Sequence, residues 1–126
     1  MLGRVNCPCG TGRPTDACCG PVLAGRPAPT AEALMRSRYT AFVLGDTAHL
    51  TASWHSSTRP RRLRLEPGSV WTGLEILDRS GGSMSDTEGT VEFRAHRTDG
   101  ALHERSRFVR EDGRWVYVDG DLSPGR

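Results

Sequence analysis

The chain has 126 residues, a formal net charge of +2 and a mean hydropathy of −0.50. This length fits one domain with a small appendage and excludes two full domains. No apolar run approaches the roughly 20 residues that a membrane-spanning helix needs, and residues 1–6 hold no apolar stretch that could act as a signal peptide. We therefore expect a cytoplasmic protein with reduced thiols and no membrane association. The mild charge argues against nucleic acid as its main partner.

All the cysteines lie near the start of the chain, with the spacing C-x-C-x8-C-C. A tetrahedral zinc ion needs four soft, deprotonated ligands brought together by tight turns, and the Gly- and Pro-rich sequence around the cysteines supplies such turns. Residues 1–25 also lack the apolar periodicity of a segment that folds on burial alone. The pattern predicts a structural zinc site with no open coordination position; disulfides are the alternative. The predicted ligands are Cys7, Cys9, Cys18 and Cys19.

Two helices are predicted after a short Pro-rich linker. Thr30 is a suitable N-cap, and apolar residues then recur at helical spacing, which predicts a helix over residues 31–44 with one buried face. Gly45 stops this helix. Asp46 can cap a second helix that ends near His55.

A loop over residues 56–69 follows the helices and holds the densest positive segment of the chain, at residues 59–64. We interpret this segment as a solvated loop; a phosphate or RNA contact is the alternative. Beyond the loop the apolar pattern changes to a period of two, with Gly-rich and Asp-Gly turns between the runs. The pattern predicts an antiparallel meander, and helices on one side of such a sheet define an α+β domain. The predicted strands are 70–78, 90–97, 102–110 and 114–119.

Several segments resemble a known family. The run CPCGTGR closed by the Cys-Cys pair resembles the SEC-C motif, a small zinc-binding element. The runs PTAEALMRSRY, WH followed by STRP, HERSRF and GRWVYVDG resemble the YchJ family, also called UPF0225, over nearly the whole chain. The resemblance implies a SEC-C-like zinc knuckle at residues 1–25 and an NTF2-like (cystatin-like) cone of helices on a curved antiparallel sheet at residues 29–122. Cys19 stands where the motif often has His, so all four ligands would be thiolates.

A cone of this kind leaves a pocket at its wide end. Strand alternation places polar side chains of the last two strands on the same inward face as the apolar core, and the helices add others. Among them, His55 and Glu104 would form a general acid–base pair. Alternatively, Glu104 pairs with an arginine such as Arg36 or Arg38, and His55 caps the second helix. The predicted pocket residues are Tyr39, Trp54, His55, Glu104, Ser106 and Tyr117.

Two classes of function follow from these observations. The first is a zinc-binding adaptor or ligand-binding module, with the knuckle docked on a protein partner and a small molecule in the cone. The second is a small hydrolase or isomerase that uses the predicted acid–base pair. The resemblance also implies a homodimer through the outer face of the sheet. There we expect His96 and His103 at the surface, and Trp71 either covers an open sheet edge or forms part of a dimer surface. Because the predicted core contains no cysteine, we expect Cys9→Ser to unfold the knuckle and spare the cone.

Overall fold

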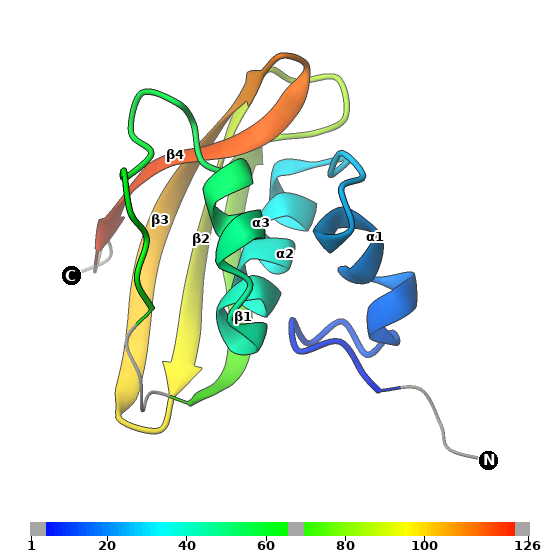
Figure 1. Ribbon diagram of the computed structural model, residues 1–126, viewed down its shortest axis with the longest axis vertical. Helices are drawn as coiled ribbons and strands as arrows, with labels where there is room; N and C mark the ends of the chain where they lie inside the picture. The colour runs from blue at the N-terminus through cyan, green and yellow to red at the C-terminus, as the bar shows by residue number, and fades with distance from the viewer. Residues whose placement is uncertain (1–4, 66–69, 123–126) are drawn as a thin grey trace.

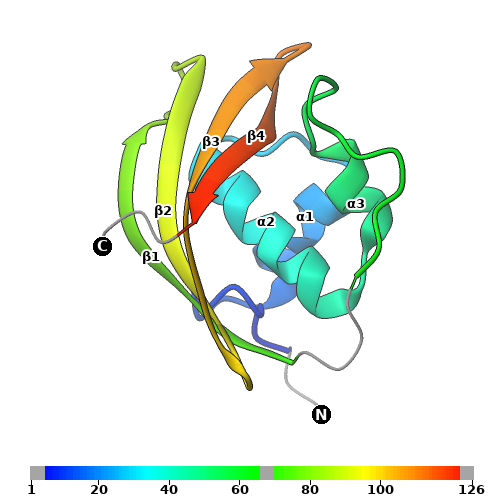
Figure 2. The same ribbon diagram turned by 90° about the vertical axis from the view of Figure 1, so that its left-hand side faces the viewer.

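The computed structural model describes residues 5–65 and 70–122, so residues 1–4 of the predicted knuckle, residues 66–69 of the predicted loop and residues 123–126 fall outside the described residues. The sheet is an antiparallel meander with the order β1-β2-β3-β4, and it curves around the helices on its concave face (Figures 1 and 2). This arrangement confirms the predicted α+β class. In chain order the elements are η1 Thr15–Ala17, α1 Gly20–Leu23, α2 Ala31–Leu44, α3 Thr47–Ala52, β1 Trp71–Gly81, β2 Glu88–Arg97, β3 Gly100–Glu111 and β4 Arg114–Leu122.

Helix α2 begins and ends where the sequence predicted. The Thr30 hydroxyl accepts a hydrogen bond from the backbone N–H of Ala33 at 3.0 Å, which caps the first turn. Gly45 follows the last turn with φ of 75°, a left-handed conformation that glycine adopts without steric cost. Asp46 then caps α3 by accepting a hydrogen bond from the N–H of His49 at 3.0 Å. These caps set the length of α2, which packs against the sheet on one side and against α1 and α3 on its other sides.

Helix α3 ends at Ala52, earlier than the predicted end near His55. The carbonyl of Ser53 accepts a hydrogen bond from the N–H of Tyr117 at 2.8 Å, and the carbonyl of Tyr117 accepts one from the N–H of His55 at 2.7 Å. Trp54 therefore forms a parallel bridge with strand β4. The chain leaves the helix because these backbone groups pair with β4, which lies at one edge of the sheet.

The strands extend further than the predicted ones. Strand β1 ends at Gly81 and pairs there with Gly89, although the apolar pattern stops at Asp78. Strand β4 likewise continues past Asp119 to Leu122. The difference has a simple cause: an apolar pattern reports which side chains are buried, whereas the backbone ladder also continues between polar residues and glycines.

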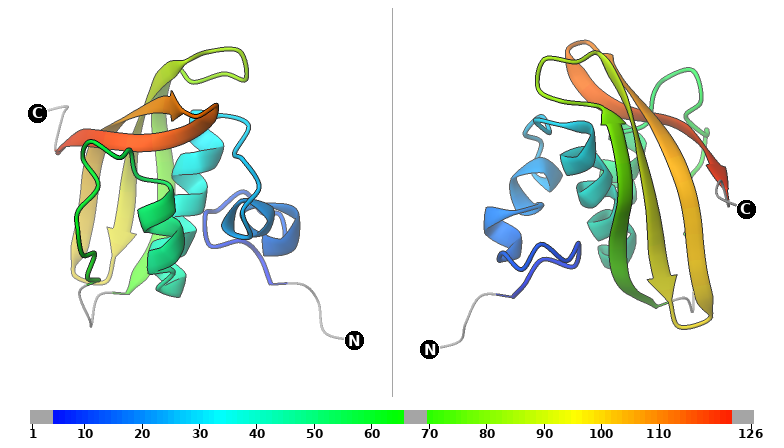
Figure 3. Two further views of the ribbon diagram at one scale, coloured as in Figure 1. Left: turned by 45° about the horizontal axis from the view of Figure 1, so that its top comes forward. Right: turned by 180° about the vertical axis from the view of Figure 1, so that it is seen from behind.

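One hydrophobic core joins the knuckle to the cone. It includes the thiols of Cys7, Cys9 and Cys19 together with α2 and the concave face of the sheet. The expectation that this core contains no cysteine is therefore wrong. Figure 3 shows the knuckle and α1 beside α2, near the β1 edge of the sheet. The predicted inward face of the strands is confirmed by the burial of Val91, Phe93, Phe108 and Trp115.

Candidate functional site

The four cysteines form a compact cluster. Their sulfur atoms all lie within 4.8 Å of one another, and those of Cys9 and Cys18 are 3.5 Å apart. In a tetrahedral site with Zn–S bonds of roughly 2.3 Å, sulfur atoms are separated by about 3.8 Å. All four cysteines are free thiols, so the disulfide alternative is not formed. The cluster is compatible with a metal site.

Two turns bring the cysteines together. The N–H of Cys7 donates to the carbonyl of Arg13 at 2.8 Å, and the N–H of Gly10 donates back to the carbonyl of Cys7 at 3.2 Å. Gly10 has φ of 88°, so this turn uses the freedom of glycine. The second pair of cysteines follows directly after η1, where the N–H of Cys18 donates to the carbonyl of Thr15 at 3.0 Å. The short sequence between the pairs therefore folds both of them toward one point.

Threonine hydroxyls form a second layer around the sulfur atoms. The hydroxyl of Thr40, on α2, donates to the sulfur of Cys19 at 3.3 Å and lies 3.7 Å from that of Cys7. Thr11 lies 3.1 Å from the sulfur of Cys18. Thr40 is fully buried. Sequence reasoning did not identify it, because it belongs to no motif and only the packing of α2 against the knuckle brings it there.

The thiols affect one another's ionisation. Hydrogen bonds to its sulfur, first from Cys19, hold the pKa of Cys9 well below its ordinary value in spite of burial. Burial raises the pKa of Cys18, and the hydrogen bond with Cys9 raises that of Cys19. Buried thiols this close together do not all ionise unless a cation offsets much of their negative charge. A divalent metal ion would supply that charge, so the donor set fits zinc.

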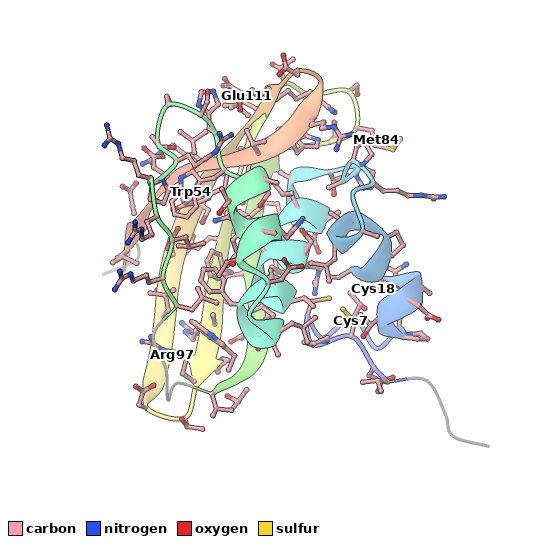
Figure 4. The ribbon with its side chains drawn as sticks, in the orientation of Figure 1. Cys7, Cys18, Trp54, Met84, Arg97 and Glu111 are labelled. Carbon is pink, nitrogen blue, oxygen red and sulfur yellow. The ribbon has the colours of Figure 1, made fainter. Side chains whose placement is uncertain are left out.

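A partly open cavity of about 420 Å³ lies on the other side of α2, lined by α2, residues 63–65 of the loop and the concave face of the sheet. Figure 4 shows Trp54 on this side of the helices and Cys7 and Cys18 on the opposite side. The structure brings five of the six predicted pocket residues to the cavity wall: Tyr39, Trp54, Glu104, Ser106 and Tyr117.

His55 does not line the cavity. Its Nδ1 atom lies 2.7 Å from the hydroxyl of Ser57, and its Nε2 atom lies 3.6 Å from a carboxylate oxygen of Glu111. Because neighbouring residues of an extended segment point in opposite directions, Trp54 faces the cavity and His55 faces away. The predicted acid–base pair of His55 with Glu104 is therefore not formed, and the hydrolase or isomerase alternative loses that pair. His55 does not cap α3 either, since the C-cap is Ser53.

Glu104 is held in place by its neighbours on β3 and β4. Its carboxylate accepts hydrogen bonds from the hydroxyl of Ser106 at 2.7 Å and from that of Tyr117 at 3.2 Å. A Cβ atom at Gly120 would collide with a carboxylate oxygen of Glu104, so the glycine leaves the space that this side chain occupies. Burial and, secondly, the charge of Glu104 raise the pKa of Tyr117, which therefore keeps its proton.

Arg38 is the charged residue that α2 buries beside the cavity. Its Nη1 atom donates to the carbonyl of Leu50 at 2.9 Å and to the hydroxyl of Ser53 at 2.7 Å. Its Cζ atom lies 4.9 Å and 4.6 Å from the ring centres of Trp54 and Tyr117, within range of cation–π attraction. Burial lowers the pKa of Arg38 to about 10, so the guanidinium stays cationic at neutral pH. The predicted ion pair of Glu104 with an arginine does not occur among the described residues.

Trp71 forms part of the cavity wall. Its ring centre lies 6.1 Å from that of Tyr39 and 5.9 Å from that of Phe42. The guanidinium carbon of Arg97 lies 5.2 Å from the same ring. Sequence reasoning left the role of Trp71 undecided, because a tryptophan at the first position of an edge strand can face either side.

The outer face of the sheet carries charged pairs between neighbouring strands. His96 lies 3.2 Å from a carboxylate oxygen of Glu75, and His103 lies 2.7 Å from one of Glu92. Arg105 binds the other oxygen of Glu92 at 2.7 Å. Both histidines therefore lie on the face opposite the core, as predicted. A homodimer through this face stays a prediction.

The basic loop passes beside the mouth of the cavity. Arg59 turns back and donates to the carbonyl of Trp54 at 2.9 Å, while Arg61 and Arg62 are exposed. Arg64 is exposed and also lines the cavity. The part of the loop that the structure describes, up to residue 65, agrees with a solvated segment. Across residues 5–65 and 70–122, no helix combines the length and the apolar character that crossing a bilayer requires.

The fold and the cysteine cluster together define an NTF2-like α+β protein with an N-terminal SEC-C-type cysteine motif. The family model described as "YchJ, middle NTF2-like domain" matches residues 30–120. A UPF0225 protein of Streptomyces coelicolor is 60% identical over 117 residues, which cover 92% of this chain and 94% of the relative. One of Chromobacterium violaceum is 51% identical and covers 93% of each chain. The chain belongs to the YchJ (UPF0225) family.

Two solved structures share the fold and the motif. The solution structure of a SEC-C motif containing protein from Rhodopseudomonas palustris superposes with a TM-score of 0.77 at 36% identity, covering 93% of this chain and 98% of that one. The crystal structure of a SEC-C motif containing protein from Psychrobacter arcticus gives a TM-score of 0.75 at 28% identity, covering 95% of this chain and 84% of that one.

Proposed function

We propose that this protein is a ligand-binding module whose shape is held by a structural zinc ion. One observation carries the proposal: helix α2 contributes to both sites. Thr40 contacts the sulfur atoms of Cys7 and Cys19, while Arg38 and Tyr39 of the same helix line the cavity. A metal ion bound on one side of α2 would therefore fix the helix that forms a wall of the cavity on the other side.

Zinc in this proposal has no open coordination position. Four thiolates fill a tetrahedral site and leave no place for water, so the ion would fold the knuckle and would not activate a substrate. Two arginines lie close enough to offset part of the negative charge that four thiolates and one zinc ion leave. Arg13 lies 3.9 Å from the sulfur of Cys18, and Arg36 donates to the carbonyl of Cys9 at 2.7 Å. Because thiolate ligands persist in a reducing compartment, we infer a cytoplasmic location.

Metal analysis tests the zinc part of the proposal. Elemental analysis after purification without chelators is expected to find one zinc ion per chain. X-ray absorption at the zinc edge should then give sulfur ligands at about 2.3 Å, the bond length of a thiolate site. A metal-free protein with four reactive thiols and an intact fold would refute this part.

NMR titration with small neutral aromatic compounds tests the cavity separately. We expect some of them to shift the resonances of cavity residues, including the indole N–H of Trp54. Ala95 is buried in the cavity wall, so Ala95→Phe should fill the space and abolish the shifts. Ala101→Phe, at an exposed position of β3, is the matched control and should leave them. If no aromatic compound, neutral or anionic, shifts the cavity resonances, ligand binding in the cone is wrong.

Docking of a protein partner on the knuckle is a second candidate function. Val5, an apolar residue, is 77% exposed there, and Gly10, Gly12 and Arg13 of the adjoining turn are exposed as well. A Val5→Ser variant should lose affinity for such a partner while it retains its zinc. Equal partner binding by both forms would argue against docking at this surface.

A further inference from the structure

We propose that the cavity binds a small organic carboxylate with a flat apolar body, an inference that rests on the proposed ligand-binding function. Its starting point is Arg38, which lines the cavity and is only 4% exposed. Within residues 5–65 and 70–122 it is the one charged side chain that is buried, and it forms no ion pair with a carboxylate there. Glu104 attracts the guanidinium without touching it. A buried cation with no carboxylate in contact is costly, and an anion in the adjacent cavity would reduce that cost.

The guanidinium of Arg38 has hydrogen-bond donors that no described protein atom accepts from. Within the described structure both of its hydrogen bonds leave from Nη1, to Leu50 and Ser53. The Nε–H and Nη2 donors therefore find no acceptor on the described protein. The rings of Trp54 and Tyr117 lie close to the guanidinium carbon, and they offer π-electrons but no acceptor atom in the guanidinium plane. An oxygen pair of a bound carboxylate can fill these positions, because its geometry matches the guanidinium fork.

Two other residues of the cavity wall also have a hydrogen-bond donor without a partner. The indole N–H of Trp54 and the Nε–H of Arg97 are buried without a hydrogen-bond partner in the described structure, and both residues line the cavity. The Nε atom of Arg97 lies 3.7 Å from a carboxylate oxygen of Asp99, which is an ion pair but too long for a hydrogen bond. Among the described residues that line the cavity, Glu104 is the single carboxylate, and it already accepts two hydrogen bonds. Such a wall complements a ligand that is rich in acceptors.

The charge balance and the walls narrow the ligand further. Among the described lining residues there are three arginines and one carboxylate. Arg97 is partly balanced by Asp99 and Arg64 is exposed, so Arg38 contributes most of the buried positive charge, which favours an anion. The negative charge of Glu104 disfavours a second negative charge on the ligand, which favours a carboxylate over a phosphate dianion. The remaining wall is largely apolar, with aromatic rings beside aliphatic side chains, and suits a flat apolar body. Its aromatic residues beside Trp54 and Tyr117 are Tyr39, Phe42, Trp71 and Phe93.

Calorimetric titration of the zinc-loaded full chain at pH 7 tests the inference with two probes of the same shape. Naphthalene-2-carboxylate is expected to bind at least roughly tenfold more tightly than naphthalene-2-carboxamide, the range for a charge-assisted hydrogen-bond pair. The dianion 2-naphthyl phosphate should bind more weakly than the carboxylate. Arg38→Gln should bring the carboxylate and the carboxamide within about twofold of each other, since it removes the charge. Arg97→Gln should reduce the preference by less.

Arg94→Gln is the matched control, because Arg94 lies on the same strand as Arg97 but on the outer face, where it pairs with Glu75. It should leave the preference unchanged. If Arg38→Gln does not fold, the Nε–H resonance of Arg38 in the unaltered protein replaces it. That resonance should shift with the carboxylate and not with the carboxamide; the opposite result would overturn the inference.

Equal affinity for carboxylate and carboxamide would overturn the anion preference and leave ligand binding in the cavity intact. Tighter binding of the phosphate would overturn the choice of a carboxylate. A preference that survives in Arg38→Gln would show that this arginine is not the anion site. If neither naphthalene compound binds, the inference is wrong, and the cavity function is then decided by the titration with neutral compounds.

Discussion

The knuckle and the cone are stabilised by different chemistry. The described knuckle contains helical segments of three and four residues, and neither of them buries a side chain. The cone has a helix of 14 residues and strands of 9 to 12 residues around an apolar core. A segment as short as the knuckle cannot bury enough apolar surface to fold on its own. Binding of a metal ion by the four sulfur atoms would therefore stabilise the knuckle, as apolar burial stabilises the cone.

The two regions are nevertheless not independent. Three of the cysteines lie in the same core as α2 and the sheet, and the turn at Gly10 lies against the carbonyl of Leu74 in β1. The knuckle thus covers part of α2 that would otherwise face water. This arrangement predicts that loss of the metal site affects the cone, in contrast to what the sequence suggested. The division of the chain between residues 25 and 29 stays a prediction.

Cys9→Ser has the largest expected effect. Cys9 is completely buried, and the change removes a proposed zinc ligand from the shared core. We expect one cooperative thermal transition, destabilised by about 4 kcal/mol or more, the range that accompanies loss of a metal site. Circular dichroism together with tryptophan fluorescence measures it, since all three tryptophans lie in the cone. Removing zinc from the unaltered protein with a chelator should reproduce the loss. Two transitions, with the tryptophan signal unchanged, would restore the picture of separate units.

Leu50→Ala tests how the stability of the cone affects the metal site, at a position that does not contact the cysteines. Leu50 is completely buried on α3 but lies outside the core cluster that contains the thiols. We expect a loss of about 2–5 kcal/mol from the cavity that the substitution leaves. Below the unfolding transition the variant should still bind one zinc ion per chain, as metal analysis would show. Loss of zinc from the folded variant would mean that the core of the cone affects the metal site as strongly as the metal site affects the cone.

Much of the fold could be predicted, because local patterns determine it. Thr30, Gly45 and Asp46 mark helix ends through their own hydrogen bonds and backbone preferences, and the period of two identifies the strands. The cysteine cluster was predictable for the same reason: its ligands lie close together in the sequence. The cavity depends on long-range packing. Two features arise between segments far apart in the chain: the turn of Trp54 onto β4, which directs His55 away, and the burial of Arg38 without an ion pair among the described residues.

Of these three substitutions, Thr40→Val should have the smallest effect. It tests the contact between α2 and the cysteine cluster. Valine keeps the shape of threonine but removes the hydroxyl that contacts Cys7 and Cys19. We expect a loss of about 1 kcal/mol of stability, the usual value of one hydrogen bond, and a zinc affinity lower by roughly tenfold, as for other second-layer contacts. Thr51→Val, at an exposed position of α3, is the matched control and should change neither quantity. Competition with a chromophoric chelator measures the affinity. If Thr40→Val lowers stability but not zinc affinity, the hydroxyl serves the packing of α2, and the two regions are coupled through the apolar core alone.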